Sequence, residues 1–168
     1  DYKIYVFGGV ATHVQVHLGR GGGNHRWVLH DRSYTPLVDV DLNQIMSIVI
    51  DNLSERITDR HAEVKVGNLP TVQGDDTQMV QLFQNLVGNG IKFNESGKPK
   101  VDITCEEQGR DWKIIVKDNG IGMNPSEIPL IFAPFKRLHG REKYEGTGIG
   151  LAVCRNIVNR HGGSIGVE

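Results

Sequence analysis

Two long strand patterns in the middle of the sequence limit the fold most strongly. VDITCEEQ and WKIIVKD both alternate apolar and polar residues, and the turn Gly109-Arg110-Asp111 joins them. Alternation with a period of two is typical of strands that bury one face. Apolar residues at helical spacing come before and after this pair, so helices and strands are interleaved along the chain. The sequence therefore predicts an α/β layer structure.

Two helices are predicted before the strand pair and one after it. Asp41 suits the N-cap of the first helix, and Asp75 or Asp76 suits that of the second. Their apolar faces consist of Ile45, Ile48, Val49, Leu53 and Ile57 in the first, and Met79, Leu82, Phe83, Leu86 and Ile91 in the second. EVKV and SIGV read as short strands, and a short helix is expected near Ser126.

Composition excludes several classes of protein. The chain has 168 residues, 38% of them hydrophobic and 23% charged, and its net charge is -1, which suits one ordinary globular domain. This balance does not favour nucleic acid as a partner, and no apolar run is long enough for a membrane span. The two cysteines have no C-x-x-C partner, and the seven histidines form no cluster with metal-ligand spacing. We expect a cytoplasmic domain.

The first 38 residues have a different pattern and carry no assigned chemistry. YKIYVF and VATHVQVHL alternate like strands around Gly8-Gly9, and LGRGGGN reads as a loop. The predicted organisation is thus an unassigned, β-rich segment over residues 1–38 and a second unit over residues 39–168.

Polar side chains follow one stripe of the second predicted helix. Gln81, Asn85, Asn89 and Lys92 are spaced so that they share a face, opposite the apolar residues. An ordinary solvated face has the same pattern. However, an amide oxygen is also a ligand that Mg²⁺ accepts, and a lysine supplies a point charge for a phosphate.

A carboxylate and glycines follow the second strong strand, in Asp118-Asn119-Gly120-Ile121-Gly122-Met123. Asp118 can accept a hydrogen bond from an exocyclic amine such as that of adenine, while Ile121 and Met123 offer apolar contact to a ring. The alternative is a plain Asp-Asn-Gly turn.

A glycine-rich turn opens the last predicted helix. Gly146, Gly148 and Gly150 alternate and lead directly into its apolar residues. The free N–H groups of a helix N-terminus bind anions, although the same pattern also fits a simple glycine-rich loop.

In this order, the amide-and-lysine helix, DNGIGM, IFAPFKRLH and GTGIGLAV closely resemble the catalytic ATP-binding domain of sensor histidine kinases. That domain belongs to the superfamily of gyrase, heat-shock-chaperone, histidine-kinase and MutL ATPases. The matching boxes of the family are the N box at 81–93, the G1 box at 118–123, the F box at 131–135 and the G2 box at 146–151. The stretch FKRLHGREKYEGTGIGLAV, followed by RHGG, looks most like kinases found with phytochromes.

The resemblance implies a two-layer α/β sandwich, with a mixed and mainly antiparallel sheet and three helices, that binds ATP and Mg²⁺. Asn85 would coordinate the metal ion, and Asn89 and Lys92 would bind phosphate oxygens. Asp118 would recognise the adenine amino group, and Gly120 and Gly122 would shape the base pocket.

The other two boxes are implied to close the site. Phe132 and Phe135 would anchor a mobile lid over residues 124–145. The G2 box would meet the triphosphate with backbone N–H groups, and its members among the expected ligands are Gly146, Thr147, Gly148, Gly150 and Leu151. The basic lid residues would reach the phosphates, or else be solvated: Arg137, His139, Arg141 and Lys143.

Other nucleotide-binding patterns fit less well. The glycine spacing misses the G-x-G-x-x-G fingerprint by one residue, and Gly97-Lys98 is followed by Pro99 rather than by a P-loop Ser or Thr. The H-R-D and D-F-G motifs of eukaryotic protein kinases are absent.

Gln81 stands where ATPases of the superfamily usually carry a glutamate. Glutamine cannot take a proton from water, so slow hydrolysis is expected and the γ-phosphoryl would pass to a histidine. That histidine would lie in a separate dimerisation domain, and a response regulator would be the next partner. His30 of LHDRSYTPL fits the acceptor pattern poorly because Pro36 is one residue too far away.

The end of the sequence adds a structural expectation. The family usually continues beyond SIGV into a final β-strand that this sequence lacks, and YKIYVF is a candidate for the vacant sheet edge. The alternative function is a nucleotide-binding regulatory module or truncated fragment without kinase activity. A second alternative is an ATPase of the superfamily, which Gln81 disfavours.

Overall fold

The helices of the protein agree well with the apolar spacing. The computed structural model describes residues 13–19, 38–109, 111–138 and 144–167. Its helices are α1 (Leu42–Asn52), α2 (Ser54–Asp59), α3 (Asp76–Lys92) and α4 (Gly150–Arg160), with a 3-10 turn, η1 (Ile128–Leu130). Asp41 and Asp75 are the N-caps of α1 and α3, and each carboxylate accepts a hydrogen bond at 2.9 Å from a backbone N–H of the first turn.

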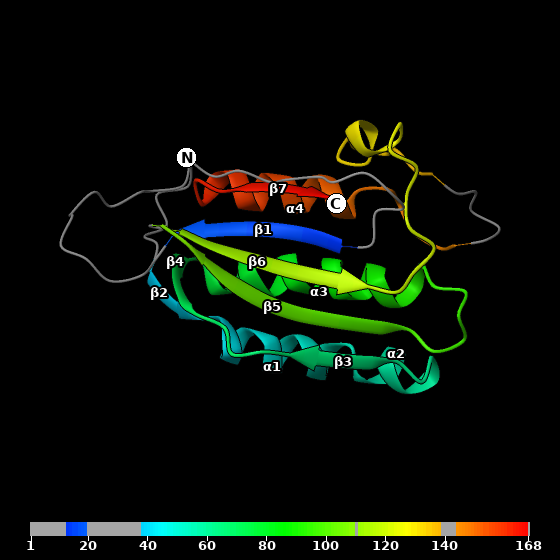
Figure 1. Cartoon of the computed structure of the whole chain (residues 1–168), viewed down its shortest axis with the longest axis horizontal. Helices are drawn as coiled ribbons and strands as arrows, with labels where there is room; N and C mark the ends of the chain where they lie inside the picture. Colours follow the sequence, from blue (N-terminus) through cyan, green and yellow to red (C-terminus); the bar gives the residue numbers. More distant parts are fainter. Residues whose placement is uncertain (1–12, 20–37, 110, 139–143, 168) are drawn as a thin grey trace.

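The first predicted helix is divided in two. We expected it to continue through Ile57, but α1 ends at Asn52 and the backbone of Leu53 departs from helical angles (φ -101°, ψ 5°). Leu53 still packs in the core, so the apolar spacing continues across the break. As a result α2 is a separate short helix that follows α1 (Figure 1).

The main sheet has five strands in the order β3-β5-β6-β1-β7. The strands in the described residues are β1 (His13–Gly19), β2 (Val38–Asp41), β3 (Glu63–Val66), β4 (Thr71–Gly74), β5 (Lys100–Gln108), β6 (Asp111–Asp118) and β7 (Ser164–Val167). Only the β3–β5 pair is parallel, so the predicted mixed and mainly antiparallel sheet is confirmed. β2 and β4, which the sequence did not reveal, form a separate antiparallel pair.

The helices cover one face of this sheet (Figure 1). Along β6, Ile114 and Val116 are buried, and they pair with Cys105 and Ile103 of β5. The apolar side chains of α3 complete the core from the other layer. The largest fully buried ones are Met79, Leu82, Phe83 and Ile91. Because residues two apart share a face, Asp118 at the end of β6 also points toward the helices. The binding cavity starts from this strand end.

β1 is an inner strand of the sheet and comes from the N-terminal segment. It pairs antiparallel with β6 on one side, from His13 opposite Lys117 to Gly19 opposite Asp111. On the other side it pairs antiparallel with β7, which places Gln15 opposite Gly166. YKIYVF, the candidate for the vacant sheet edge, lies outside the described residues, so its placement stays a prediction. Within the described residues, the N-terminal segment contributes HVQVHLG to the sheet.

A buried histidine connects α4 to the start of α3. His161 is 5% exposed, and its Nε2 accepts a hydrogen bond from the backbone N–H of Asp75 at 3.0 Å. Its Nδ1 lies 2.8 Å from the carbonyl oxygen of Ile157, and the neutral tautomer that donates here satisfies both nitrogens. Both ring nitrogens of His161 are thus engaged with backbone groups of the core.

Two asparagines fasten the loop after β6 to the end of α3. The Asn119 Oδ1 atom accepts hydrogen bonds from Asn94 Nδ2 and from the backbone N–H of Lys100, both at 2.7 Å. Asn94 is 3% exposed and also donates to the carbonyl oxygen of Asn119 at 3.0 Å. A satisfied polar network in a buried position fixes its members strongly. The Asp-Asn-Gly turn is therefore held at a set place relative to α3.

Replacing Gln15 by proline tests the placement of β1. An inner strand offers every N–H to one neighbour or the other, so Gln15→Pro should remove a ladder hydrogen bond and lower the free energy of unfolding by more than about 2 kcal/mol. Amide exchange at Ile165 in β7 should become faster. Gln15→Ala is the matched control and should change stability by less than about 1 kcal/mol. An unchanged unfolding midpoint for the proline variant would show that β1 is not an inner strand.

Replacing Asn119 by alanine tests the asparagine network. The change leaves the Lys100 N–H without its acceptor and removes one partner of buried Asn94, so we expect a loss of about 2 to 3 kcal/mol in a urea titration. Asn159→Ala on the exposed side of α4 is the control and should stay within about 0.5 kcal/mol of the parent. Equal stability of the two variants would contradict the network.

Candidate nucleotide-binding site

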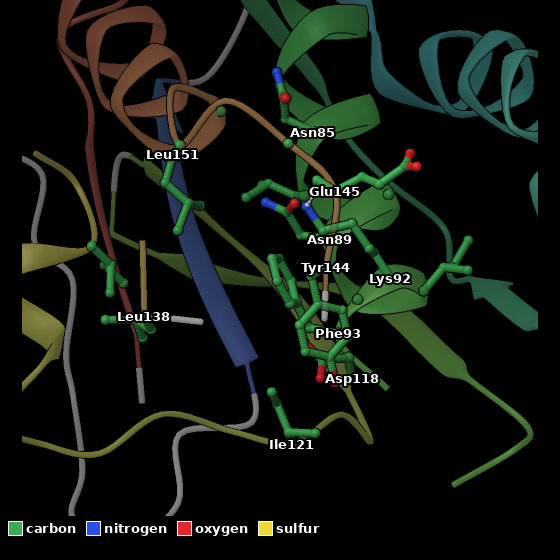
Figure 2. A pocket seen from close by; sticks show the side chains of 18 of the residues that line it. Asn85, Asn89, Lys92, Phe93, Asp118, Ile121, Leu138, Tyr144, Glu145 and Leu151 are labelled. Atoms are coloured by element: carbon green, nitrogen blue, oxygen red, sulfur yellow. Dashed lines mark hydrogen bonds between the residues drawn. The ribbon is translucent and has the colours of Figure 1, made fainter. Parts of the chain in front are cut away.

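A large cavity lies between α3, the end of β6 and the loop before α4. Its volume is about 890 Å³. The expected ligands that line it are Asn85, Asn89, Lys92, Asp118, Gly122, Arg137, Gly146, Thr147, Gly148, Gly150 and Leu151. Figure 2 shows Asn85, Asn89 and Lys92 along α3 with Leu151 across from them and Asp118 at the far end. Three segments far apart in the sequence thus meet around one space.

The glycine-rich loop packs directly against the polar stripe of α3. A Cβ atom added at Gly150 would lie 3.0 Å from Asn85 Oδ1, and one added at Gly146 would lie 3.1 Å from Lys92 Nζ. Gly146 and Gly148 also have positive φ angles of 138° and 74°, which other residues rarely adopt. Glycine is therefore required by both conformation and space where the loop meets α3.

Asn85 presents its amide oxygen on the cavity side. Its Nδ2 donates to the carbonyl oxygen of Gln81 at 2.9 Å, while its Oδ1 faces Gly150. Gln81 itself does not line the cavity. No group of three His, Cys, Asp or Glu side chains that could hold a metal occurs in the described parts of the chain. A cation would thus need oxygens from its ligand in addition to Asn85, as Mg²⁺ does in phosphate complexes.

Lys92 and Arg137 hold the chain segment before the glycine-rich loop. Lys92 Nζ donates to the carbonyl oxygen of Glu145 at 2.8 Å and lies 4.1 Å from the centre of the Phe93 ring. Arg137 donates to the carbonyl oxygens of Tyr144, at 2.6 Å, and of Gly146. Burial lowers the pKa of Lys92, the guanidinium groups of Arg56 and Arg137 lower it further, and Glu145 opposes them. The cavity therefore has a strongly cationic side.

Asp118 lies at the other end, where α3 and β6 approach closely. A Cβ atom at Gly90 would lie 2.9 Å from Val101 Cγ2 and 3.1 Å from Asp118 Cβ, so only glycine lets the helix come this near. Asp118 Oδ1 accepts a hydrogen bond from the Gly120 N–H at 2.8 Å. Gly120 does not line the cavity, but a side chain there would meet the Phe93 carbonyl oxygen at 2.4 Å.

Aromatic and aliphatic side chains surround this end of the cavity. The rings of Phe93 and Tyr144 lie 4.9 Å apart, and the Tyr144 hydroxyl donates to Glu95 at 3.1 Å. Ile121 and Met123 line the same cavity, as the sequence suggested. Phe93 and Tyr144 were missed as lining residues, although both stand beside predicted ligands in the sequence.

The two phenylalanines of the F box lie away from the cavity. Phe132 is buried at 7% exposure, with the Arg155 guanidinium 5.9 Å from its ring centre. Phe135 is 75% exposed and has a positive φ of 63°. Neither lines the cavity. The other expected lid ligands at positions 139, 141 and 143 lie outside the described residues, so their role stays a prediction.

Helix α2 adds charged side chains that no motif indicated. Glu55, Arg56, Asp59 and Arg60 line the cavity from the side of α2. Arg60 donates to the carbonyl oxygen of Asn94 at 3.1 Å, which connects α2 to the end of α3. Their part in the site depends on how α2 packs against α3, which periodicity alone does not disclose.

The arrangement suits a ligand with two unlike parts. One end offers a carboxylate beside aromatic and aliphatic side chains, which fits a flat heterocycle carrying an amino group. The other end offers cations and the N-terminus of α4, which fit a polyanion. An adenine nucleotide with several phosphates has both parts.

No helix in the described residues is long and apolar enough to cross a membrane.

Comparisons with known proteins agree with this geometry. The phytochrome-like protein Cph1 of Synechocystis is 42% identical over 82% of this chain, which corresponds to 18% of Cph1. The sensor histidine kinase ZraS of Escherichia coli K12 is 33% identical over 80% of the chain and 29% of ZraS. The chain thus spans less than a third of the length of these relatives.

Solved structures show the same fold. A mycobacterial sensor histidine kinase, MprB, matches with a TM-score of 0.62 and 26% identity over 75% of this chain and 80% of that one. The catalytic domain of histidine kinase ThkA matches with a TM-score of 0.62 and 25% identity, over 73% and 80% of the two chains. The family model of histidine kinase-, DNA gyrase B- and HSP90-like ATPases matches residues 74–168, more than half of the chain. The protein belongs to this family of ATPases.

Proposed function

We propose that residues 39–168 form the catalytic ATP-binding domain of a sensor histidine kinase. The domain binds Mg²⁺ and ATP and donates the γ-phosphoryl group to a histidine of a separate dimerisation domain. The observation that carries this proposal is that Asp118 and three residues of the polar stripe of α3, Asn85, Asn89 and Lys92, line one cavity. The kinase relatives support transfer of the phosphoryl group to a histidine. No chemistry is assigned to residues 1–38, of which β1 belongs to the sheet.

The adenine end would be recognised by Asp118. Its carboxylate accepts a hydrogen bond from the exocyclic amino group, and guanine presents an oxygen at that position, which a carboxylate repels. Gly120 holds the Asp118 carboxylate through its N–H, and Gly122 lines the space beside it. The rings of Phe93 and Tyr144 give the base an apolar boundary.

The triphosphate would lie along α3 toward Asn85. Asn89, Lys92 and Arg137 bind its oxygens, and the backbone of residues 146–151 meets them from the α4 side. Mg²⁺ would neutralise part of the phosphate charge. Asn85 fits as its one protein ligand because its amide nitrogen is already engaged and its oxygen faces the cavity side.

Transfer then requires little covalent work from this domain. A neutral imidazole nitrogen of the acceptor attacks the γ-phosphorus, the bond from that phosphorus to the bridging oxygen breaks, and ADP leaves. Catalysis comes from positioning and charge neutralisation. Gln81 has no basic group for activating water, so the phosphoryl group is kept for the histidine. In this proposal a response regulator is the next partner, and the domain is cytoplasmic.

Asp118→Asn tests adenine recognition. The amide can no longer offer two acceptor oxygens, so calorimetric titration with ATP and Mg²⁺ should show at least about tenfold weaker binding, as expected for a charge-assisted hydrogen bond. GTP should bind the parent protein far more weakly than ATP. Omitting Mg²⁺ should weaken ATP binding to the parent and should have little effect on Asn85→Ala. Equal ATP binding by Asp118→Asn would refute the assigned base pocket.

Phosphoryl transfer separates a kinase from a module that only binds nucleotide. The protein is incubated with γ-labelled ATP and a separately supplied histidine-hairpin domain from a histidine kinase. We expect acid-labile label on the hairpin and little free phosphate, while Lys92→Ala lowers transfer at least about tenfold. Tight ATP binding without any transfer would favour the regulatory module. Rapid phosphate release without the hairpin would favour an ATPase instead.

A further inference from the structure

Arg56 of α2 reaches the cationic side of the cavity although it lies outside all four sequence motifs. It lines the cavity together with Asn85, Gly88 and Lys92 of α3. The family model that matches this chain begins only at residue 74, so α2 is outside the matched range. The position of Arg56 follows from packing between helices.

The Arg56 guanidinium lies directly on the backbone of α3. A Cβ atom added at Gly88 would be 3.3 Å from Arg56 Nη1. On a helix, residue 88 shares a face with residues 85 and 92, so the guanidinium lies on the side of α3 that also carries the Asn85 amide and the Lys92 ammonium. Glycine in the middle of a helix weakens it, and here glycine provides the space that the guanidinium occupies.

Arg56 and Arg137 both lie close enough to the Lys92 ammonium group to affect it. Arg56 and Arg137 both act on Lys92, and after burial they are the next causes of its lowered pKa. Arg56, Arg137 and Lys92 are thus three neighbouring cations. Lys92 already donates to the carbonyl oxygen of Glu145, and Arg137 donates to those of Tyr144 and Gly146. A polyvalent anion bound in the cavity would lower the repulsion among these three cations.

Arg56 differs from its neighbour Arg60 in its partners. Arg60 donates to the carbonyl oxygen of Asn94 at 3.1 Å. Among the described residues, the Arg56 guanidinium forms no hydrogen bond or ion pair. This holds for the nearby carboxylates of Glu55 and Asp59 as well. Within this part of the chain its N–H donors have no acceptor, and the oxygen atoms of a ligand in the cavity could serve as one.

We propose that Arg56 binds phosphate oxygens of the nucleotide from the α2 side, opposite the glycine-rich loop. This inference rests on the proposed function and adds a ligand to it. A planar guanidinium suits a phosphate because it can donate two parallel hydrogen bonds. The triphosphate is then held between three elements: α3, the segment before α4, and α2.

The test compares ATP, ADP and AMP, each titrated calorimetrically with Mg²⁺ into the parent protein and into Arg56→Ala. We expect ATP to bind Arg56→Ala about tenfold more weakly or worse, while AMP changes by less than about twofold. Arg56→Lys should recover only part of the loss because an ammonium cannot form the paired hydrogen bonds. Gly88→Ala should weaken ATP binding less than Arg56→Ala does, since its Cβ would shift the end of the guanidinium only slightly.

The controls separate a ligand role from a structural one. Arg160→Ala removes an equal charge from the exposed side of α4 and should leave all three affinities unchanged, and thermal unfolding of each variant reports on folding. Equal loss of ATP and AMP affinity in Arg56→Ala would indicate a structural effect and overturn the inference. Unchanged ATP affinity would also overturn it while leaving the proposed function intact. A parent protein that binds none of the nucleotides would overturn both.

Discussion

The close approach of α3 to the strand end of β6 is the constraint on which the rest of the site depends. Gly90 permits it, because any side chain there would collide with Val101 and Asp118. The Asn94–Asn119 network then fixes the loop after β6 against the end of the same helix. Together they set the distance between the Asp118 carboxylate and the polar stripe of α3. Packing of the two layers thus fixes the spacing of the groups that line the cavity.

Most of the fold could be predicted because its elements carry strong local signals. The two central strands alternate with a period of two, and aspartates cap α1 and α3 where the apolar spacing begins. β2 and β4 were missed, although β3 and β7 are equally short and were predicted, so four residues are at the limit of what a local pattern reveals. The placement of β1 between β6 and β7 could not be predicted either, since strand order depends on long-range pairing that no local pattern encodes.

The cavity-lining residues that could be predicted are those at which the backbone conformation requires a particular residue type. The ones that were missed line the cavity through tertiary contacts alone. The glycines before α4 stand out because their backbone angles and their distance from Asn85 and Lys92 exclude side chains. Arg56 and Tyr144 have ordinary backbones and line the cavity only because of tertiary packing. Phe135 is the reverse case: it belongs to a recognisable box, yet its side chain is exposed and outside the cavity.

The charge of the site is a local property that the composition conceals. The chain as a whole has a net charge of -1, but the field inside a cleft depends on which side chains surround it. Burial and two guanidinium groups lower the pKa of Lys92, so the free energy of the charged ammonium is raised in this cavity. A polyanion would offset that repulsion and bring the pKa back up. In the proposed function, binding of a triphosphate would therefore be strengthened by relief of this repulsion.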